Sequence, residues 1–215
     1  LYGADTSAWN SVDTASFGWS SLFNSEESWS LGAFANNGSG HPDYGWGTYT
    51  TSNHDINGDR IFIIKLSNGD YKQIMIAKMS AAGVYTVKVG DIGGANSSYF
   101  QLDKKDAAYA GKSFVFYSLV NMAVVNEEPA TASWDLLFTK YITLIPAGPQ
   151  ILPYLVSGVK VNASYEVAER TGFPTSSNDT STLIWSKSIT VIGSDWKTFN
   201  NSTCLYDMYP DLAYF

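Results

Sequence analysis

The chain has 215 residues, of which 45% are hydrophobic, 15% aromatic and only 15% charged, and its net charge is -7. This apolar content supports a sizeable core and argues against disorder, while an acidic balance without a Lys/Arg cluster argues against nucleic-acid binding. The one cysteine, Cys204, excludes an internal disulfide, and no window is apolar over the length of a membrane-spanning helix. We expect a single strand-rich domain over residues 1–215 that does not span a membrane.

Residues 1–59 are rich in Gly, Ser, Asn and Trp, which predicts irregular loops held by buried aromatic side chains. Aromatic residues crowd between Trp29 and Tyr49, among them Tyr44 and Trp46. Such residues suit either core packing or the lining of a ligand groove. Core packing is the favoured interpretation, and the groove stays open as the alternative.

The acidic and amide residues Asn53, Asp55, Asn57 and Asp59 alternate in the manner of a calcium-binding loop. Position twelve of such a loop is a closing glutamate, but here it is Ile64. A turn at Asn57-Gly58, just before the next strand, is therefore the favoured interpretation.

An antiparallel meander is the clearest prediction of the first half. Strands at residues 61–66 and 71–76 flank Asn68-Gly69, a strong hairpin signal, and a second turn at Ala82-Gly83 leads to a strand at 84–89. Residues 90–98 are expected to form a loop, 103–109 a helical turn, and 114–125 a further core strand. Pro129 ends that strand.

Residues 134–141 carry the strongest strand signal. Trp134 and Phe138 fall on one face and Leu137 on the other, so both faces are apolar, which predicts a central strand in the middle of a sandwich. A buried carboxylate needs partners, so Asp135 is expected to accept hydrogen bonds from backbone amides or a hydroxyl group.

The last third alternates strands with polar loops. Three prolines and a glycine at residues 145–153 predict a protruding loop or bent hairpin rather than a regular ladder. Strand character returns at 156–167 and 183–192, and the polar tract 171–182 is expected to be exposed. The chain as a whole is predicted to be all-β, an antiparallel sandwich with long loops and short helices.

No catalytic or metal-binding motif is evident. His41 and His54 have no metal-like spacing to Cys204, and the adjacent carboxylate pairs 26–27 and 127–128 point in opposite directions on a strand. Six Asn-x-Ser/Thr sequons occur, at Asn37, Asn96, Asn162, Asn178, Asn200 and Asn201, and in so Ser/Thr-rich a chain they carry little weight. The chain is not expected to be an enzyme.

Several separated motifs resemble the HmuY family, haem-binding and related exported proteins of Bacteroidota. They are the 134–141 segment, the acidic Pro turn before it, Gly158-Val159-Lys160-Val161 and Asp195-Trp196-Lys197-Thr198-Phe199, with further likeness at Asn24-Ser25, Trp29, Gly32-Ala33-Phe34, Gly45-Trp46-Gly47 and residues 61–71. The resemblance implies an all-β fold and export, as a lipoprotein or by type IX secretion, to the cell surface or the medium. Longer relatives carry another strand ahead of the position of Leu1, so the domain is expected to lack one.

In this family haem is held between protruding loops by His or Met, yet the chain has neither residue between Tyr141 and Asp207. Tyr154 and Tyr165, with Trp46 and Tyr44, are the remaining ligand-binding candidates. We expect a non-enzymatic exported binding protein, with haem as the candidate ligand and residues 146–155 and 171–182 as the contact region. The alternatives are a structural subunit of a surface layer or appendage that assembles by strand addition, and a carbohydrate-binding module.

Overall fold

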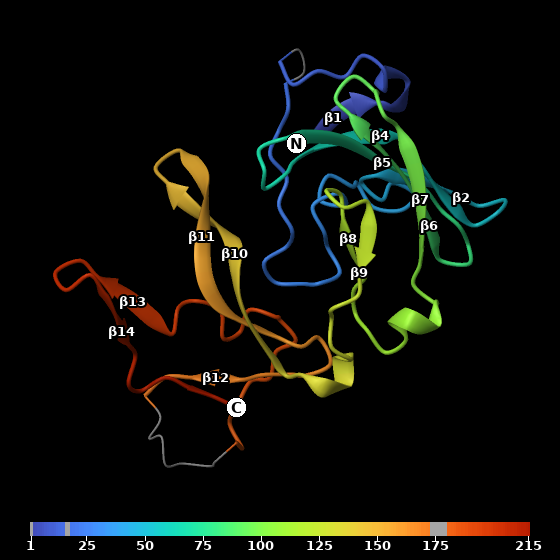
Figure 1. Cartoon of the computed structure of the whole chain (residues 1–215). Coiled ribbons are helices and arrows are strands. Elements are labelled where there is room, and N and C mark those ends of the chain that lie inside the picture. Colours follow the sequence, from blue (N-terminus) through green and yellow to red (C-terminus); the bar gives the residue numbers. More distant parts are fainter. Residues whose placement is uncertain (1, 16–17, 173–179) are drawn as a thin grey trace. The chain divides into compact units, whose positions relative to one another are not determined.

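The computed structural model describes residues 2–15, 18–172 and 180–215 (Figure 1). All strand pairs in these ranges are antiparallel. The helices there are single 3-10 turns, η1 (Thr6–Ala8), η2 (Ala107–Tyr109) and η3 (Thr131–Ser133). The predicted all-β antiparallel class is therefore confirmed, and it is consistent with a sandwich-like fold.

The contacts divide the chain into two compact units. Unit 1 contains Gly32–Ala130 and the described residues before Ser25, and unit 2 contains Ser25–Leu31 and Thr131–Phe215. The single HmuY-type domain over 1–215 stays a prediction.

Unit 1 is built on a seven-stranded sheet in which β1, β4, β5, β3 and β2 are neighbours in that order, while β6 pairs with β5 and β7. The strands are β1 (Tyr2–Asp5), β2 (Gly47–Thr50), β3 (Asp55–Gly58), β4 (Arg60–Lys65), β5 (Tyr71–Met79), β6 (Val84–Asp91) and β7 (Ser98–Asp103). A short hairpin, β8 (Phe116–Ser118) with β9 (Ala123–Val125), follows in the chain.

Both faces of this sheet are covered, because β4 alternates apolar side chains to either side. Ile61 and Ile63 pack with Trp9 and Val12 on one face. Phe62 packs on the other with a second group, which consists of Trp46, Ile56, Ile74 and Val87. Burying each large apolar side chain contributes roughly 2 kcal/mol, so these two layers hold the sheet.

The predicted meander is confirmed, but two predictions for the segments that follow it differ from the structure. The Leu66 amide donates to the Asp70 carbonyl across the Asn68-Gly69 turn at 2.8 Å. Strand β7 was missed because its Ser-Tyr-Phe-Gln-Leu pattern follows a glycine-rich turn. The expected core strand at 114–125 is wrong, since a turn divides it into β8 and β9.

The favoured turn at Asn57-Gly58 is also wrong, since these residues end β3 and pair with β2 at Thr48 and Gly47. Asp55 has partners on other segments of unit 1. Its carboxylate lies 2.5 Å from the Lys78 amine and accepts a hydrogen bond from the Ala81 amide.

The described residues of unit 2 form three two-stranded sheets. The pairs are β10 (Leu136–Ala147) with β11 (Gln150–Val161), β12 (Glu169–Arg170) with β15 (Ala213–Tyr214), and β13 (Lys197–Asn200) with β14 (Leu205–Met208). The predicted strand at 183–192 is wrong, because that segment makes only a single bridge, Ser186 to Val167, and otherwise lies in turns and coil. Part of the polar tract at 171–182 lies outside the described residues.

Candidate functional site

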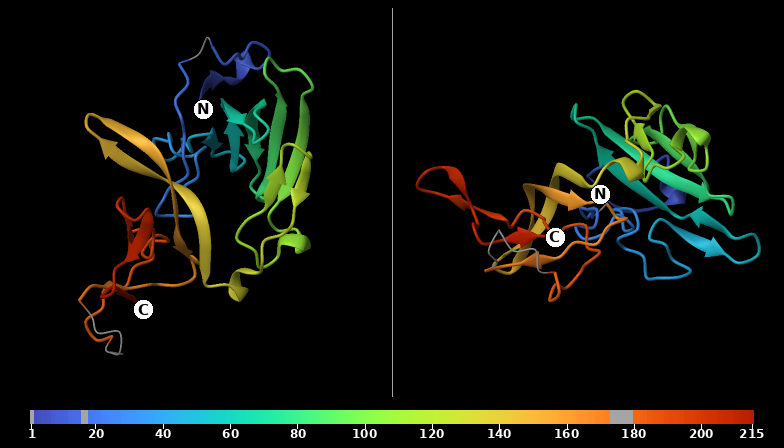
Figure 2. Two further views of the ribbon diagram at one scale, coloured as in Figure 1. Left: turned by 60° about the vertical axis from the view of Figure 1, so that its left-hand side comes forward. Right: turned by 90° about the horizontal axis from the view of Figure 1, so that it is seen from below.

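The longest ladder among the described residues is a hairpin, the β10–β11 arm (residues 136–161). Twelve residues from each strand pair without a break in register, from Leu136 opposite Val161 to Ala147 opposite Gln150. Gly148 takes a positive φ of 64°, which suits a two-residue turn with Pro149. Figure 2 shows from two further sides that this ribbon is strongly twisted along its length.

The prediction that 145–153 is no regular ladder is wrong, and the position of the prolines explains why. Pro146 lies opposite Ile151, and Pro153 lies opposite Leu144. Both strands are edges of a two-stranded sheet, and proline is tolerated on an edge where its missing N–H would face away from the partner strand.

The arm is apolar on both faces. No charged residue occurs from Tyr141 to Val159. Leu144, Ile151 and Leu155 are exposed on one face, and Ile145, Leu152 and Tyr154 on the other. Contiguous exposed apolar surface marks an interaction site more often than ordinary surface does.

At its root the arm is fixed by a buried lysine. Lys160 is only 4% exposed, and its amine lies 4.6 Å from the ring centre of Tyr141 and 5.0 Å from that of Trp29. The amine also donates to the carbonyl oxygen of Glu26 at 3.2 Å. Burial lowers the pKa of Lys160, and the nearby charge of Glu26 opposes that shift. The segment 25–31 is thereby tied to β11.

Asn162, which follows β11, is 1% exposed and uses its whole amide group. Its Nδ2 donates to the carbonyls of Thr131 and Trp134, both at 2.7 Å, and its Oδ1 accepts from the Ser164 amide at 3.0 Å. The sequon at this position therefore has a structural role in the fold.

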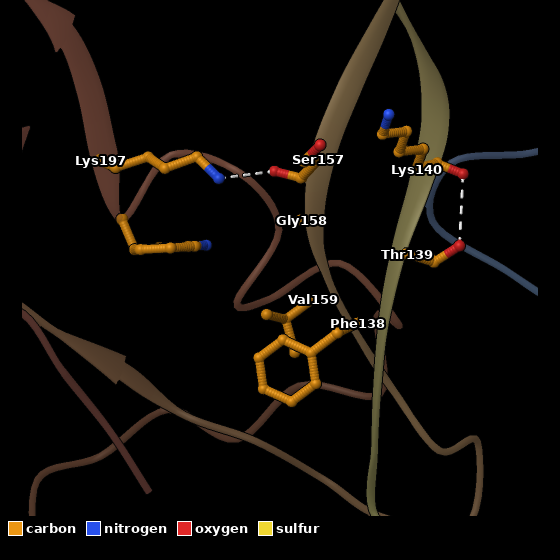
Figure 3. A pocket seen from close by; sticks show the side chains of 8 residues that line it. Phe138, Thr139, Lys140, Ser157, Gly158, Val159 and Lys197 are labelled. Carbon is orange, nitrogen blue, oxygen red and sulfur yellow. Dashed lines mark hydrogen bonds between the residues drawn. The ribbon is translucent and has the colours of Figure 1, made fainter. Parts of the chain in front are cut away.

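A pocket of about 440 Å³ lies beside the root of the arm (Figure 3). We call it the root pocket. It is lined by Phe138, Thr139, Lys140, Ser157, Gly158, Val159, Trp196 and Lys197. The side chains of Phe138 and Val159 lie together on it, and Lys197 donates to the Ser157 carbonyl at 2.8 Å. The Lys197 amine also lies 4.1 Å from the Trp196 ring centre. The pocket thus combines apolar and aromatic surface with two cations.

The glycine in this lining is required by close packing. A Cβ on Gly158 would collide with the carbonyl of Gly193. The adjacent Val159 amide donates to that same carbonyl at 2.8 Å, so the backbones of β11 and residue 193 are in direct contact.

Met208 is a candidate that sequence reasoning missed. It pairs with Lys197 across β13 and β14, and directly opposed residues of a ladder project to the same face. Its side chain is exposed. Met208 lies one residue beyond the stretch from Tyr141 to Asp207, which has neither His nor Met.

The predicted strand at 134–141 exists from Leu136, but its central, doubly buried position is wrong. Phe138 is 75% exposed, and Leu136 and Leu137 are exposed as well. Asp135 is exposed rather than buried, although the expected hydroxyl partner is present, since hydrogen bonding to Asp135 raises the pKa of Tyr165. Trp134 is half-buried, and its indole Nε1 has no hydrogen-bond partner among the described residues.

The four ligand-binding candidates are divided between the two units. Tyr154 is 59% exposed on the face of the arm opposite Phe138, and Tyr165 lies beyond β11 beside Asp135. Trp46 and Tyr44 belong to unit 1. Trp46 is 7% exposed in the core, as the packing interpretation expects, while Tyr44 is exposed.

Within the described ranges, no three His, Cys, Asp or Glu side chains are grouped as metal ligands, and no helix there has the length and apolarity to cross a membrane. No protein-family model, curated protein or solved structure compared with the chain matches it.

Proposed function

We propose that the chain is a non-enzymatic binding protein of HmuY type, exported to the outer surface of a bacterium of the Bacteroidota. The proposed ligand is a planar, largely apolar molecule that carries carboxylates, with haem as the named candidate. This ligand binds in the root pocket. The observation that carries the proposal is the exposed ring of Phe138 beside two lysines in one hollow.

The lining suits each part of such a ligand. Phe138 and Trp196 offer aromatic surface for a planar ring system. Lys140 and Lys197 offer two positive charges for a pair of carboxylates, and the Lys197 amine is already held by the Ser157 carbonyl. These groups supply contact surface and charge, which suit binding.

Met208 supplies the candidate iron ligand. A thioether is an established axial ligand of haem iron, and Met208 projects on the Lys197 side of its hairpin. Tyr165 is less suited, because its hydrogen bond with Asp135 raises the pKa of the phenol and so disfavours the phenolate that would bind iron.

Titration with haemin tests the proposal. We expect a shifted Soret band that saturates at one haemin per chain, and we expect Met208→Ala to change the band position. Met122→Ala is the matched control, since Met122 is an exposed methionine of unit 1 and should leave the spectrum as in the wild type. An unchanged haemin spectrum at micromolar protein would remove haem from the account.

A second candidate function, a structural subunit, is favoured by the arm itself. Apolar side chains exposed on both of its faces need cover from two sides, which neighbouring subunits would supply. Pro146 and Pro153 have no backbone N–H, so each edge of the arm lacks one hydrogen-bond donor. Contacts through the faces therefore suit the arm better than strand addition. A strictly monomeric species in size-exclusion chromatography with light scattering, at high concentration, would oppose this candidate.

A further inference from the structure

Unit 1 contains an apolar groove that the proposed function does not use. It has a volume of about 410 Å³, within the usual range of small-molecule sites. Its floor is one face of the sheet, where Ile76 of β5 lies opposite Val87 of β6, which in turn lies opposite Phe100 of β7. These side chains form a continuous hydrocarbon surface across three strands.

The opposite wall is the segment 113–119, which contributes Phe114, Val115, Tyr117 and Leu119. The ring of Tyr117 stacks on Phe100 at 3.7 Å between centres and 4° between planes, which joins wall to floor. Buried Glu128 holds the start of the wall, because its carboxylate accepts hydrogen bonds from the amides of Ser113 at 3.3 Å and Phe114 at 2.7 Å. The groove is therefore bounded by fixed elements on both sides.

One charged side chain lines this groove, that of Lys104, which is exposed and follows β7. Lys104 forms no ion pair with a carboxylate of the described residues. Asp103 accepts a hydrogen bond from the Lys105 amide and Asp106 from the Ala108 amide, and neither acid lines the groove. The described lining of the groove thus contains one cation and no carboxylate, in a chain of net charge -7.

We propose that this groove binds a free single-chain carboxylate of the fatty-acid class, with the hydrocarbon chain along the sheet face and the carboxylate at Lys104. Apolar walls favour the chain, and the lone cation favours an anion over a neutral or cationic head group. The site is separate from the root pocket, because every lining residue belongs to unit 1.

Isothermal titration with decanoate, below the concentration at which decanoate self-associates, tests this site. Decanol and decyltrimethylammonium share the chain but differ in head-group charge. We expect decanoate to bind one to one, decanol more weakly and the cation weakest. An exposed ion pair is worth up to about 1 kcal/mol, so Lys104→Met should weaken decanoate binding by about fivefold or less, and Lys104→Glu by about tenfold.

Lys105→Glu is the matched control, since Lys105 is the next residue, carries the same charge and does not line the groove. It should bind decanoate as the wild type does. Val115→Trp fills the groove from its loop wall and should abolish binding, with its fold checked by circular dichroism. Absence of decanoate binding, equal affinity for all three head groups, or equal losses in Lys104→Glu and Lys105→Glu would each overturn the proposal.

Discussion

The amine of Lys160 lies 4.6 Å from the ring centre of Tyr141, on the paired strands that form the root of the β10–β11 arm. The ring centre of Trp29 lies 5.0 Å from the same amine, and the amine donates a hydrogen bond to the Glu26 carbonyl. A cation held by aromatic rings and a carbonyl, rather than by a direct ion pair, fixes segment 25–31 to the arm that bears the root pocket.

The lowered pKa of Lys160 predicts a pH-dependent stability. Because burial lowers the pKa of this amine in the folded state below its ordinary value of 10.5, the unfolded chain binds more protons between those two values. The wild type should therefore gain stability relative to Lys160→Met as pH rises through that window. Urea unfolding of both proteins from pH 7 to 10.5 measures the difference. A constant difference would contradict the burial of this amine.

Asn162→Ala should destabilise the fold by about 2 kcal/mol, because it removes three hydrogen bonds of a buried side chain, two to part-buried carbonyls and one from an amide. Asn200→Ala is the control at another sequon. The Asn200 side chain bonds Asp207 and the Ser202 amide in an exposed turn, so its loss should cost under about 1 kcal/mol. Equal midpoints in chemical unfolding would show that Asn162 does not fix the root of the arm.

Glu128→Ala should destabilise unit 1 by about 2 kcal/mol, since it removes a buried acceptor of two backbone hydrogen bonds. Glu127→Ala alters the adjacent carboxylate, which is exposed, and should change stability by less than about 0.5 kcal/mol. Thermal unfolding compares the two variants. Indistinguishable variants would mean that Glu128 does not anchor the wall of the apolar groove.

The ion pair of Asp43 with Arg60 predicts an acid-sensitive contribution. Arg60 bonds both carboxylate oxygens, at 2.9 and 3.1 Å, and this contact is the main cause of the lowered pKa of Asp43. The pair therefore stabilises the fold above pH 3.8, and its contribution is lost as pH falls through the lowered value. Asp43→Asn should cost about 2 kcal/mol at pH 7 and progressively less below pH 3.8. A deficit that is independent of pH would contradict this.

Local signals predicted much of unit 1. Asn68-Gly69 and Ala82-Gly83 are turn sequences whose glycines take positive φ, and the strands beside them alternate as a buried sheet requires. The fold class followed from the same evidence. The two-unit division did not, because segment 25–31 joins the rest of unit 2 across about a hundred residues of sequence, as in the hydrogen bond from Trp29 to Val161.

The arm shows where periodicity fails. Apolar residues on both faces predict a central strand, but the same pattern is found in a two-stranded arm whose faces are exposed, because sequence periodicity does not report what covers a face. Prolines in a sequence argue against a central ladder, but edge strands accept them. Met208 lies opposite Lys197 through the pairing of β13 with β14, which the sequence does not reveal.

The most direct test of ligand binding at the root pocket is amide hydrogen exchange with and without haemin. Slower exchange concentrated at Phe138–Lys140, Ser157–Val159 and Trp196–Lys197, with unit 1 unchanged, is the predicted result. Identical exchange with and without haemin, or slowing confined to unit 1, would contradict the assignment of the ligand to the root of the arm.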